Sequence, residues 1–258
     1  MLIVEDFMKK CLAFIALTVL SAAAAFANVE LDLNYQAILA DTYMLTKKVT
    51  RDSEGNIIAI TPVDSRLAYI LTAPLGLDLN VNIFFGSSPR KFEAGLHFGA
   101  GIAVPSEVTF DDEGTKTAFV QDLRESDPNG FVQAGGFGAS FEIGPVFRFS
   151  LNQTHQFSIT PSIFFRFDAL ACRNSIEYVG FGDFAMGLDV DAGYKLWLVN
   201  KSGFHFGLNT GIGLELPTFA TCVLENGVDT PLTCIATEFG VKAYLGVCFN
   251  FGDRGVDR

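Results

Sequence analysis

The sequence lacks long apolar runs and has little histidine, cysteine or positive charge. Beyond residue 27 it contains no run of 18 or more apolar residues, so it contains no candidate transmembrane helix. It has three histidines and five cysteines, and because no histidine stands near the cysteines we expect no metal site. Its 18 basic and 29 acidic residues give a net charge of −11, which argues against nucleic acid as a partner.

Apolar residues are nevertheless abundant, and they are spread thinly. The chain of 258 residues is 49% hydrophobic and has a mean hydropathy of +0.32, which is high for a soluble domain. Hydropathy that is distributed over many alternating segments is typical of a membrane β-barrel.

The first 27 residues have the pattern of a secretory signal peptide. Lys9 and Lys10 form a basic region, residues 12–26 form an apolar region rich in Ala, and Ala25 and Ala27 complete a small-x-small cleavage site. An uncleaved anchor helix is the alternative. Acidic residues before the lysines leave open whether translation begins at Met1 or at Met8. We expect a cleaved signal peptide at 1–27, a barrel domain at 28–251 and a short tail at 252–258.

The clearest segment of the mature chain is 238–251. Its alternate residues from Phe239 to Phe251 are apolar, whereas those from Glu238 to Asn250 are polar, small or amphipathic. A period of two over this length predicts a strand with two different faces, and roughly 9–11 tilted residues cross a bilayer as a strand. Eight segments alternate in this way: 29–40, 67–84, 92–104, 131–149, 157–169, 181–199, 204–216 and 238–251.

The links between the eight segments alternate in length. Residues 41–66, 105–130, 170–180 and 217–236 form long links, and 86–89, 152–156 and 200–203 form short ones. In an up-and-down barrel every odd-numbered link lies at the same end. The sequence therefore predicts an all-β fold, an eight-stranded antiparallel up-and-down transmembrane β-barrel with short periplasmic turns and long extracellular loops.

Alternation fits both a membrane barrel with its apolar face outward and a secreted soluble barrel with that face inward. A small eight-stranded lumen has room for glycine and paired charges but not for Phe from every strand, which favours the membrane barrel. Pro74, Pro145 and Pro161 fall inside strands, so each should mark a bulge or a lost ladder bond. Aromatic residues gather near the short links, where an inner-interface girdle is expected: Phe84, Phe85, Phe92, Phe147, Phe149, Phe157, Trp197, Phe204, Phe249 and Phe251.

The last strand also ends in a recognisable motif. Lys242, Gly246, Phe249 and Phe251 match a polar-x-x-x-Gly-x-x-aromatic-x-aromatic pattern. In this respect the chain resembles small bacterial outer-membrane β-barrels of the OmpA/OmpX and OmpW kind, over 28–251. The resemblance implies an outer-membrane location among lipids, a monomer, and reading of Gly246, Phe249 and Phe251 by the barrel-assembly machinery. The tail at 252–258 departs from the pattern, since such chains usually stop at the aromatic residue.

Two cysteines in the last long link are candidates for a disulfide. Cys222 and Cys234 are expected outside the membrane, in an oxidising compartment, where they could close that loop. Cys172, in the preceding long link at the same end, is the competing partner. Cys248 lies near the opposite end, about 35 Å of strand away, and cannot bridge to the others.

Charged residues gather on the faces that should line the lumen. They support two readings: a salt-bridged plug that satisfies buried charge, or a narrow path for cations or small solutes. Acids outnumber bases among all the charged residues on these faces. From that larger group we single out a charge network of Arg148, Arg166, Asp168, Asp189, Asp191, Lys195 and Lys242.

The sequence says less about function than about location. His97 and His205 are expected to face the lumen, and we interpret both as structural, so we expect no catalytic residue and no cofactor. We expect a porin-like, surface-exposed protein with a structural or small-solute transport role. OmpW-like passage of small apolar molecules is one form of transport, by analogy alone. The alternative is an adhesin or ligand-binding protein whose long loops contact an extracellular ligand or host factor. A lipid-modifying outer-membrane enzyme is a third class.

Overall fold

A computed structural model describes residues 28–52, 54, 56–63, 67–85, 91–112, 115–201, 203–225 and 232–252. The signal peptide expected at 1–27 and, apart from Gly252, the tail expected at 252–258 lie outside these residues. The strands that form the barrel wall are β1 (Val29–Arg51), β3 (Leu67–Phe84), β4 (Phe92–Val104), β7 (Val132–Ser150), β8 (His155–Arg173), β9 (Tyr178–Lys201), β10 (Phe204–Glu225) and β11 (Leu232–Phe251).

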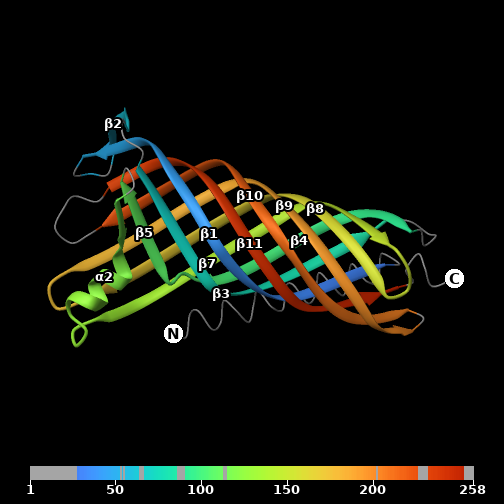
Figure 1. Ribbon diagram of the computed structural model, residues 1–258. Coiled ribbons are helices and arrows are strands. Elements are labelled where there is room, and N and C mark those ends of the chain that lie inside the picture. Colours follow the sequence, from blue (N-terminus) through green and yellow to red (C-terminus); the bar gives the residue numbers. More distant parts are fainter. Residues whose placement is uncertain are drawn as a thin grey trace.

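These eight strands form a closed ring in which every neighbouring pair is antiparallel (Figure 1). Each strand pairs with the next one along the chain, and β1 pairs with both β3 and β11, which closes the ring. At the seam between first and last strands, Val29 pairs with Phe251 and the ladder continues to Val49 and Thr233. The predicted eight-stranded up-and-down barrel is confirmed.

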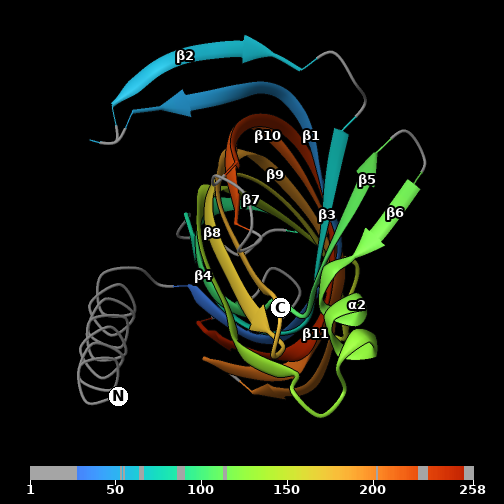
Figure 2. The ribbon, with the colours of Figure 1, turned by 90° about the vertical axis from the view of Figure 1, so that its left-hand side faces the viewer.

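The long loops contain structure that the sequence analysis did not predict. Strand β2 (Ile57–Pro62) pairs with the outer part of β1, and β5 (Glu107–Asp112) pairs with β3 and with β6 (Thr115–Ala118). The helix α2 (Phe119–Ser126) follows β6. All four elements lie at the end of the barrel opposite the short turns (Figures 1 and 2). No helix among the described residues is long and apolar enough to cross a bilayer.

Several wall strands are also longer than expected. β1 continues to Arg51 instead of ending at residue 40, and β11 begins at Leu232 instead of at 238. Toward the outer end the inward side chains become apolar, as at Val49, which is 7% exposed. At the outer ends of these strands the inward and outward faces are therefore no longer distinguished as polar and apolar in the sequence, although the backbone ladder continues.

The apolar face of the strands points outward. Phe141 and Leu188 are 46% and 54% exposed, whereas Asp189 and Lys242 are 0% and 4% exposed. A secreted soluble barrel would have the reverse arrangement, so the membrane reading is correct.

Two belts of outward aromatic residues bound the apolar surface. Phe157 and Tyr194 belong to the inner belt, and Phe167 and Phe184 to the outer belt. Ten residues separate the belts on β8 and again on β9; at the usual rise and tilt this corresponds to about 25 Å, the height of the apolar band of such barrels.

The predicted inner girdle needs one correction. Phe84 and Trp197 are only 2% and 1% exposed, so they lie inside the barrel and not in the girdle. The guanidinium of Arg148 lies 3.7 Å from the centre of the Phe84 ring, and the Trp197 indole donates a hydrogen bond to Gln156 at 3.2 Å. Each of the two residues comes two positions after an inward side chain of its own strand, Asn82 or Lys195, so strand alternation directs it inward as well.

The strand prolines coincide with irregular pairing. The β1–β3 register shifts twice near Pro74, and the β7–β8 ladder is interrupted opposite Pro145 and Pro161, between the pairs Ile143–Ile163 and Phe147–Ile159. A proline has no amide hydrogen to donate to the ladder, which explains these positions.

Candidate functional site

The lumen contains three levels of charged side chains, and the level nearest the short turns holds two bases. Nε of Arg148 donates to Glu93 at 2.7 Å, and Nζ of Lys195 lies 2.6 Å from Asp32. Glu30, which is fully buried, contacts both bases. Strands β1, β4, β7 and β9 supply these residues, so the contacts tie opposite walls of the barrel together.

The middle level is centred on Lys242. Its Nζ atom lies 2.6 Å from Glu142, 2.9 Å from Asp189 and 3.4 Å from Asp191. Nε2 of His97 is 3.6 Å from Glu142. One lysine therefore joins β7, β9 and β11 across the lumen.

The outer level is centred on Arg166. Its guanidinium lies 3.0 Å from Asp41 and 2.9 Å from Asp168, and it also contacts Glu215 and Glu238. These five side chains come from β1, β8, β10 and β11.

All of the predicted lumen charges are buried inside the barrel, at one of these three levels: Arg148, Arg166, Asp168, Asp189, Asp191, Lys195 and Lys242. Two sets of carboxylates bring ligand atoms within 4.8 Å of one another, Asp41 with Glu215 and Glu238, and Glu142 with the two β9 aspartates. A basic side chain stands at each set, Arg166 or Lys242, and already supplies positive charge there.

Above the Arg166 level the interior changes from charged to apolar. Leu71, Val108 and Phe181 are among the buried residues of a core that fills the outer end of the barrel, together with Val120 and Leu123 of α2. The inward positions of the extended strands are therefore filled by apolar packing.

The outer cysteines belong to this apolar region. Cys172, Cys222 and Cys234 are buried, and they lie on strands β8, β10 and β11 instead of in loops. Cys222 pairs directly with Cys234 in the β10–β11 ladder. Burial raises the pKa of the Cys172 thiol to about 11.

The three histidines lie apart from one another. Nδ1 of His97 is 2.8 Å from Asn82, Nδ1 of His155 is 2.6 Å from the Tyr194 hydroxyl, and Nδ1 of His205 is 3.1 Å from Asn200. His97 and His205 face the lumen, as expected, and are 3% and 1% exposed.

The extracellular helix α2 is held at its N-terminus by a half-buried carboxylate. Oε1 of Glu107 accepts hydrogen bonds from the amides of Val108 at 3.0 Å and Val120 at 2.8 Å, and Oε2 accepts one from Gln121 at 3.0 Å. Burial raises the pKa of Glu107 above its ordinary value, and the amide bonds oppose that rise. The side chain thus performs the N-cap role for α2 from a different element.

The C-terminal end of α2 is joined to the β8–β9 turn. Oδ1 of Asp127 accepts from the Gly130 amide at 3.0 Å, and Oδ2 accepts from the amide of Ser175 at 3.2 Å and from its hydroxyl. The Asn174 amide group donates to the Leu123 carbonyl at 3.3 Å and to Ser126 at 3.0 Å. The hydrogen bonds lower the pKa of Asp127. Between helix and turn lies a cleft of about 350 Å³.

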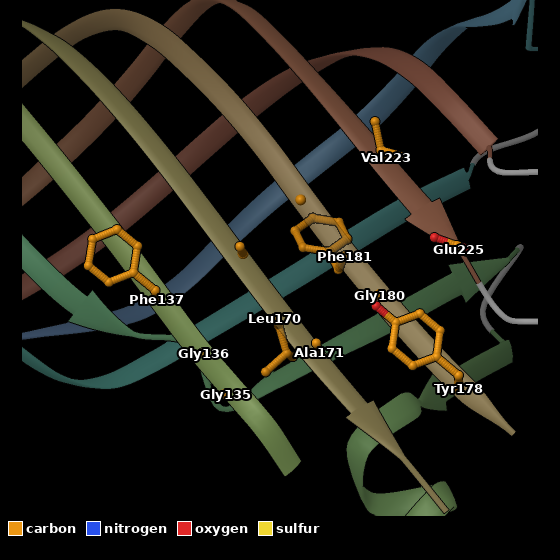
Figure 3. A pocket seen from close by; sticks show the side chains of 12 residues that line it. Gly135, Gly136, Phe137, Leu170, Ala171, Tyr178, Gly180, Phe181, Val223 and Glu225 are labelled. Atoms are coloured by element: carbon orange, nitrogen blue, oxygen red, sulfur yellow. The ribbon is translucent and has the colours of Figure 1, made fainter. Parts of the chain in front are cut away.

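A second hollow, of about 410 Å³, lies on the wall near the outer aromatic belt (Figure 3). Across β8 and β9, Ala169 pairs with Gly182 and Ala171 with Gly180, so small residues form its base. Phe137 and Tyr178 lie at its sides (Figure 3). A Cβ atom at Gly180 would lie 2.7 Å from the Tyr178 hydroxyl, so this tyrosine covers part of the hollow.

The residues of the C-terminal glycine-aromatic pattern lie along β11. A Cβ atom on Gly246 would lie 2.1 Å from the Leu33 carbonyl oxygen, so this position requires glycine for close pairing with β1. The Phe249 ring packs on Phe206 at 5.3 Å and the Phe251 ring on Phe204 at 5.8 Å, within the inner belt.

A closed antiparallel ring of eight strands, an apolar belt between two aromatic belts and a charged interior define an outer-membrane β-barrel. A scan against protein-family models finds no match, and a search of curated proteins finds none either.

Similar solved structures are also small outer-membrane proteins. The outer membrane protease OmpT from Escherichia coli has 10% identity and a TM-score of 0.42, covering 87% of this chain and 95% of that chain. The attachment invasion locus protein Ail of Yersinia pestis has 9% identity and a TM-score of 0.40, with 88% and 99% covered. A major outer membrane protein from Thermus thermophilus has 13% identity and a TM-score of 0.48, with 86% and 99% covered. Likeness at these identities concerns the fold alone.

Proposed function

We propose that the protein is a monomeric outer-membrane barrel whose membrane part is a closed anchor and whose extracellular extension binds a ligand or host factor. The observation that supports a closed membrane anchor is the set of ion pairs across the lumen. Arg148 is 0% exposed, Arg166 is 3% exposed and Lys242 is 4% exposed. Each contacts a carboxylate on a strand that is not its neighbour in the wall: Glu30, Asp41 and Glu142, respectively.

These levels leave little room for a continuous aqueous path. To pass through the lumen, a hydrated ion would have to break the ion pairs of Lys242 with Glu142 and Asp189, at 2.6 and 2.9 Å. Breaking a buried pair leaves uncompensated charge, which costs about 3–5 kcal/mol. Passage of a small apolar solute would meet the packed apolar core above Arg166 before it met these charges.

The proposed binding role rests on the extracellular extension, which consists of β2, β5, β6 and α2. Strands β2, β5 and β6 and helix α2 lie at the end of the barrel opposite the short turns (Figures 1 and 2). At that end they give the chain a structured surface outside the membrane. Glu107, Asn174 and Asp127 fix α2 to the barrel, so the surface is organised before any partner arrives. Pre-organisation lowers the entropic cost of binding.

Planar-bilayer recording of the refolded protein tests the closed anchor. We expect no current above the lipid background. The variant Lys242→Ser/Glu142→Ser, which removes the central ion pair, should increase leakage if it folds, whereas Lys116→Ser at an exposed site should not. Stable, discrete conductance steps from the unmodified protein would contradict a closed lumen.

A replacement variant tests the extracellular surface. Residues 105–130 are exchanged for a short Gly-Ser linker, and binding to candidate host-surface extracts is compared with that of the intact protein, after barrel closure has been verified by resistance to denaturation in SDS. Loss of binding is expected. Unchanged binding without this segment would remove the proposed binding role from it.

A further inference from the structure

The cleft between α2 and the β8–β9 turn has an apolar floor. Phe119 and Leu123 supply it from the helix, and Val179 supplies it from the first residues of β9. Leu123 and Val179 are buried members of the outer core, and Phe119 packs against that core. The floor is therefore part of the packed outer core, and neighbouring core side chains hold it in place.

Two carboxylates stand on opposite sides of this floor. Asp122 projects from α2 and Glu177 from the β8–β9 turn, and both are exposed. Neither carboxylate has a hydrogen bond or an ion pair to another described residue. Arg124, a basic neighbour on α2, lies 4.9 Å over the Phe131 ring and is held there.

One large apolar side chain also lies at the rim without cover. Ile176, in the turn between the two walls, is 81% exposed. The backbone beneath it is fixed, because Oδ1 of Asn174 accepts hydrogen bonds from the amides of Ile176 at 2.9 Å and Glu177 at 2.7 Å. Its exposure is therefore built into the turn.

We propose that this cleft binds a segment of an extracellular protein partner in which a basic side chain lies beside an apolar one. The basic group lies between Asp122 and Glu177, and the apolar side chain packs on Phe119 and Ile176. A volume of about 350 Å³ accommodates side chains and not a folded element. The net charge of −11 draws a basic segment toward the protein. The inference deepens the proposed extracellular binding role and rests on it.

The test uses the full-length refolded protein in nanodiscs and two labelled probe peptides, Leu-Arg-Leu-Arg-Leu and Leu-Glu-Leu-Glu-Leu. Fluorescence anisotropy should show saturable binding of the basic probe only. Asp122→Asn/Glu177→Gln should weaken that binding about three- to tenfold, the range expected for two partly exposed ion pairs. Glu54→Gln/Glu225→Gln removes the same charge from exposed sites elsewhere and should change the affinity less than about twofold.

A second pair of variants tests the apolar contact. Ile176→Ser should weaken binding of the basic probe, whereas Ile58→Ser, which removes a 63% exposed isoleucine from β2, should not. Equal weakening by both double variants, or binding that ignores Asp122→Asn/Glu177→Gln, would overturn the proposal. Competition by acetyl-arginine amide as strong as that by the peptide would also overturn it, because the site would then recognise only an isolated cation.

The outcome can be separated from that for the proposed function. If replacing 105–130 abolishes partner binding while the cleft variants do not, the extracellular surface retains its role and the cleft assignment fails. If neither change affects binding, both proposals fail.

Discussion

Nζ of Lys242 lies 2.6 Å from Oε1 of Glu142, although the two residues belong to β11 and β7, which are not neighbours in the barrel wall. The contact therefore crosses the lumen. Backbone ladders hold adjacent strands together, and this side-chain contact adds a connection between distant parts of the ring. It is the best single place to test what the charged interior contributes.

Lys242→Met should destabilise the barrel by about 3–5 kcal/mol, because Glu142, Asp189 and Asp191 would lose their shared base in a buried place. Urea unfolding of the protein in lipid vesicles measures the change. Lys116→Met serves as the control, since that side chain is 62% exposed and its contact with Asp111 is 3.9 Å. A loss below about 1 kcal/mol, the range of surface pairs, would mean that the carboxylates find other compensation.

The position of the bilayer can be tested on β9. Leu188 lies midway between Phe184 and Tyr194, and its outward side chain is 54% exposed. Leu188→Arg should cost about 2–4 kcal/mol, whereas Leu198→Arg, beyond the inner belt, should cost about 0–1 kcal/mol. Reversible unfolding into denaturant provides both values. Equal costs at the two sites would place the apolar belt elsewhere.

Cys222 and Cys234 should form a disulfide when the protein matures in an oxidising compartment. Directly paired residues on antiparallel strands have Cα atoms about 4.5–5.5 Å apart, which suits the bond. The whole of β9 separates Cys172 from β10, about 9–10 Å in strand spacing, which is too far. Closing this short loop would contribute about 3 kcal/mol.

Thiol counting with a maleimide reagent measures the pairing. The denatured mature protein should take up two labels before reduction and four after it, since four cysteines follow residue 27. Cys222→Ser should raise the first count to three, and Cys172→Ser should lower it to one. Four labels before reduction would mean that all the thiols stay free.

Acid should loosen α2 from the β8–β9 turn. Hydrogen bonds from Ser175 and Gly130 lower the pKa of Asp127, so the folded state holds the ionised form more strongly than the unfolded chain does. This contribution is present above the ordinary Asp pKa and is lost as the pH falls through the lower folded value, below about pH 4. Amide exchange at Ser175 and Gly130 should accelerate in that window, and Asp127→Asn should remove the dependence. Exchange rates that stay flat in the unmodified protein would contradict this linkage.

Glu107→Ala should fray the first turn of α2, because the amides of Val120 and Gln121 lose their acceptor. The expected cost is about 1 kcal/mol, as for loss of an N-cap. Hydrogen exchange at these two amides measures it. Glu125→Ala, at an exposed position of the same helix, is the matched control and should leave both amides protected.

The sequence predicts the membrane part of this fold well and the extracellular part poorly. In the membrane-spanning part, one face of each strand contacts lipid and the other contacts a charged lumen. Adjacent residues such as Leu188 and Asp189 therefore differ in polarity, and the sequence identifies both faces. Outside the membrane, Cys222 and Phe181 point inward into an apolar core, and the period-two contrast is lost. Short, mixed elements such as β5 and α2 are stabilised by contacts from distant residues, for example that of Glu107 with Val120, which local patterns do not contain.

The candidate sites also differ in how far the sequence predicts them. The parity of each strand identifies Arg148, Arg166 and Lys242 as lumen residues, but not which acids each one contacts, because those pairs lie across the ring. The α2 cleft has no sequence signal at all. Asp122 and Glu177 are separated by a complete hairpin, β7 and β8, and only the return of β8 to the outer end brings them to one place.

The pairing of Val29 with Phe251 brings the two ends of the wall together on the same side of the membrane. A peptide of a few residues could therefore join positions 28 and 252 covalently, and new chain ends could be opened in any extracellular link. Such a circularly permuted protein would keep every strand pair of the ring while changing which strand the cell makes last.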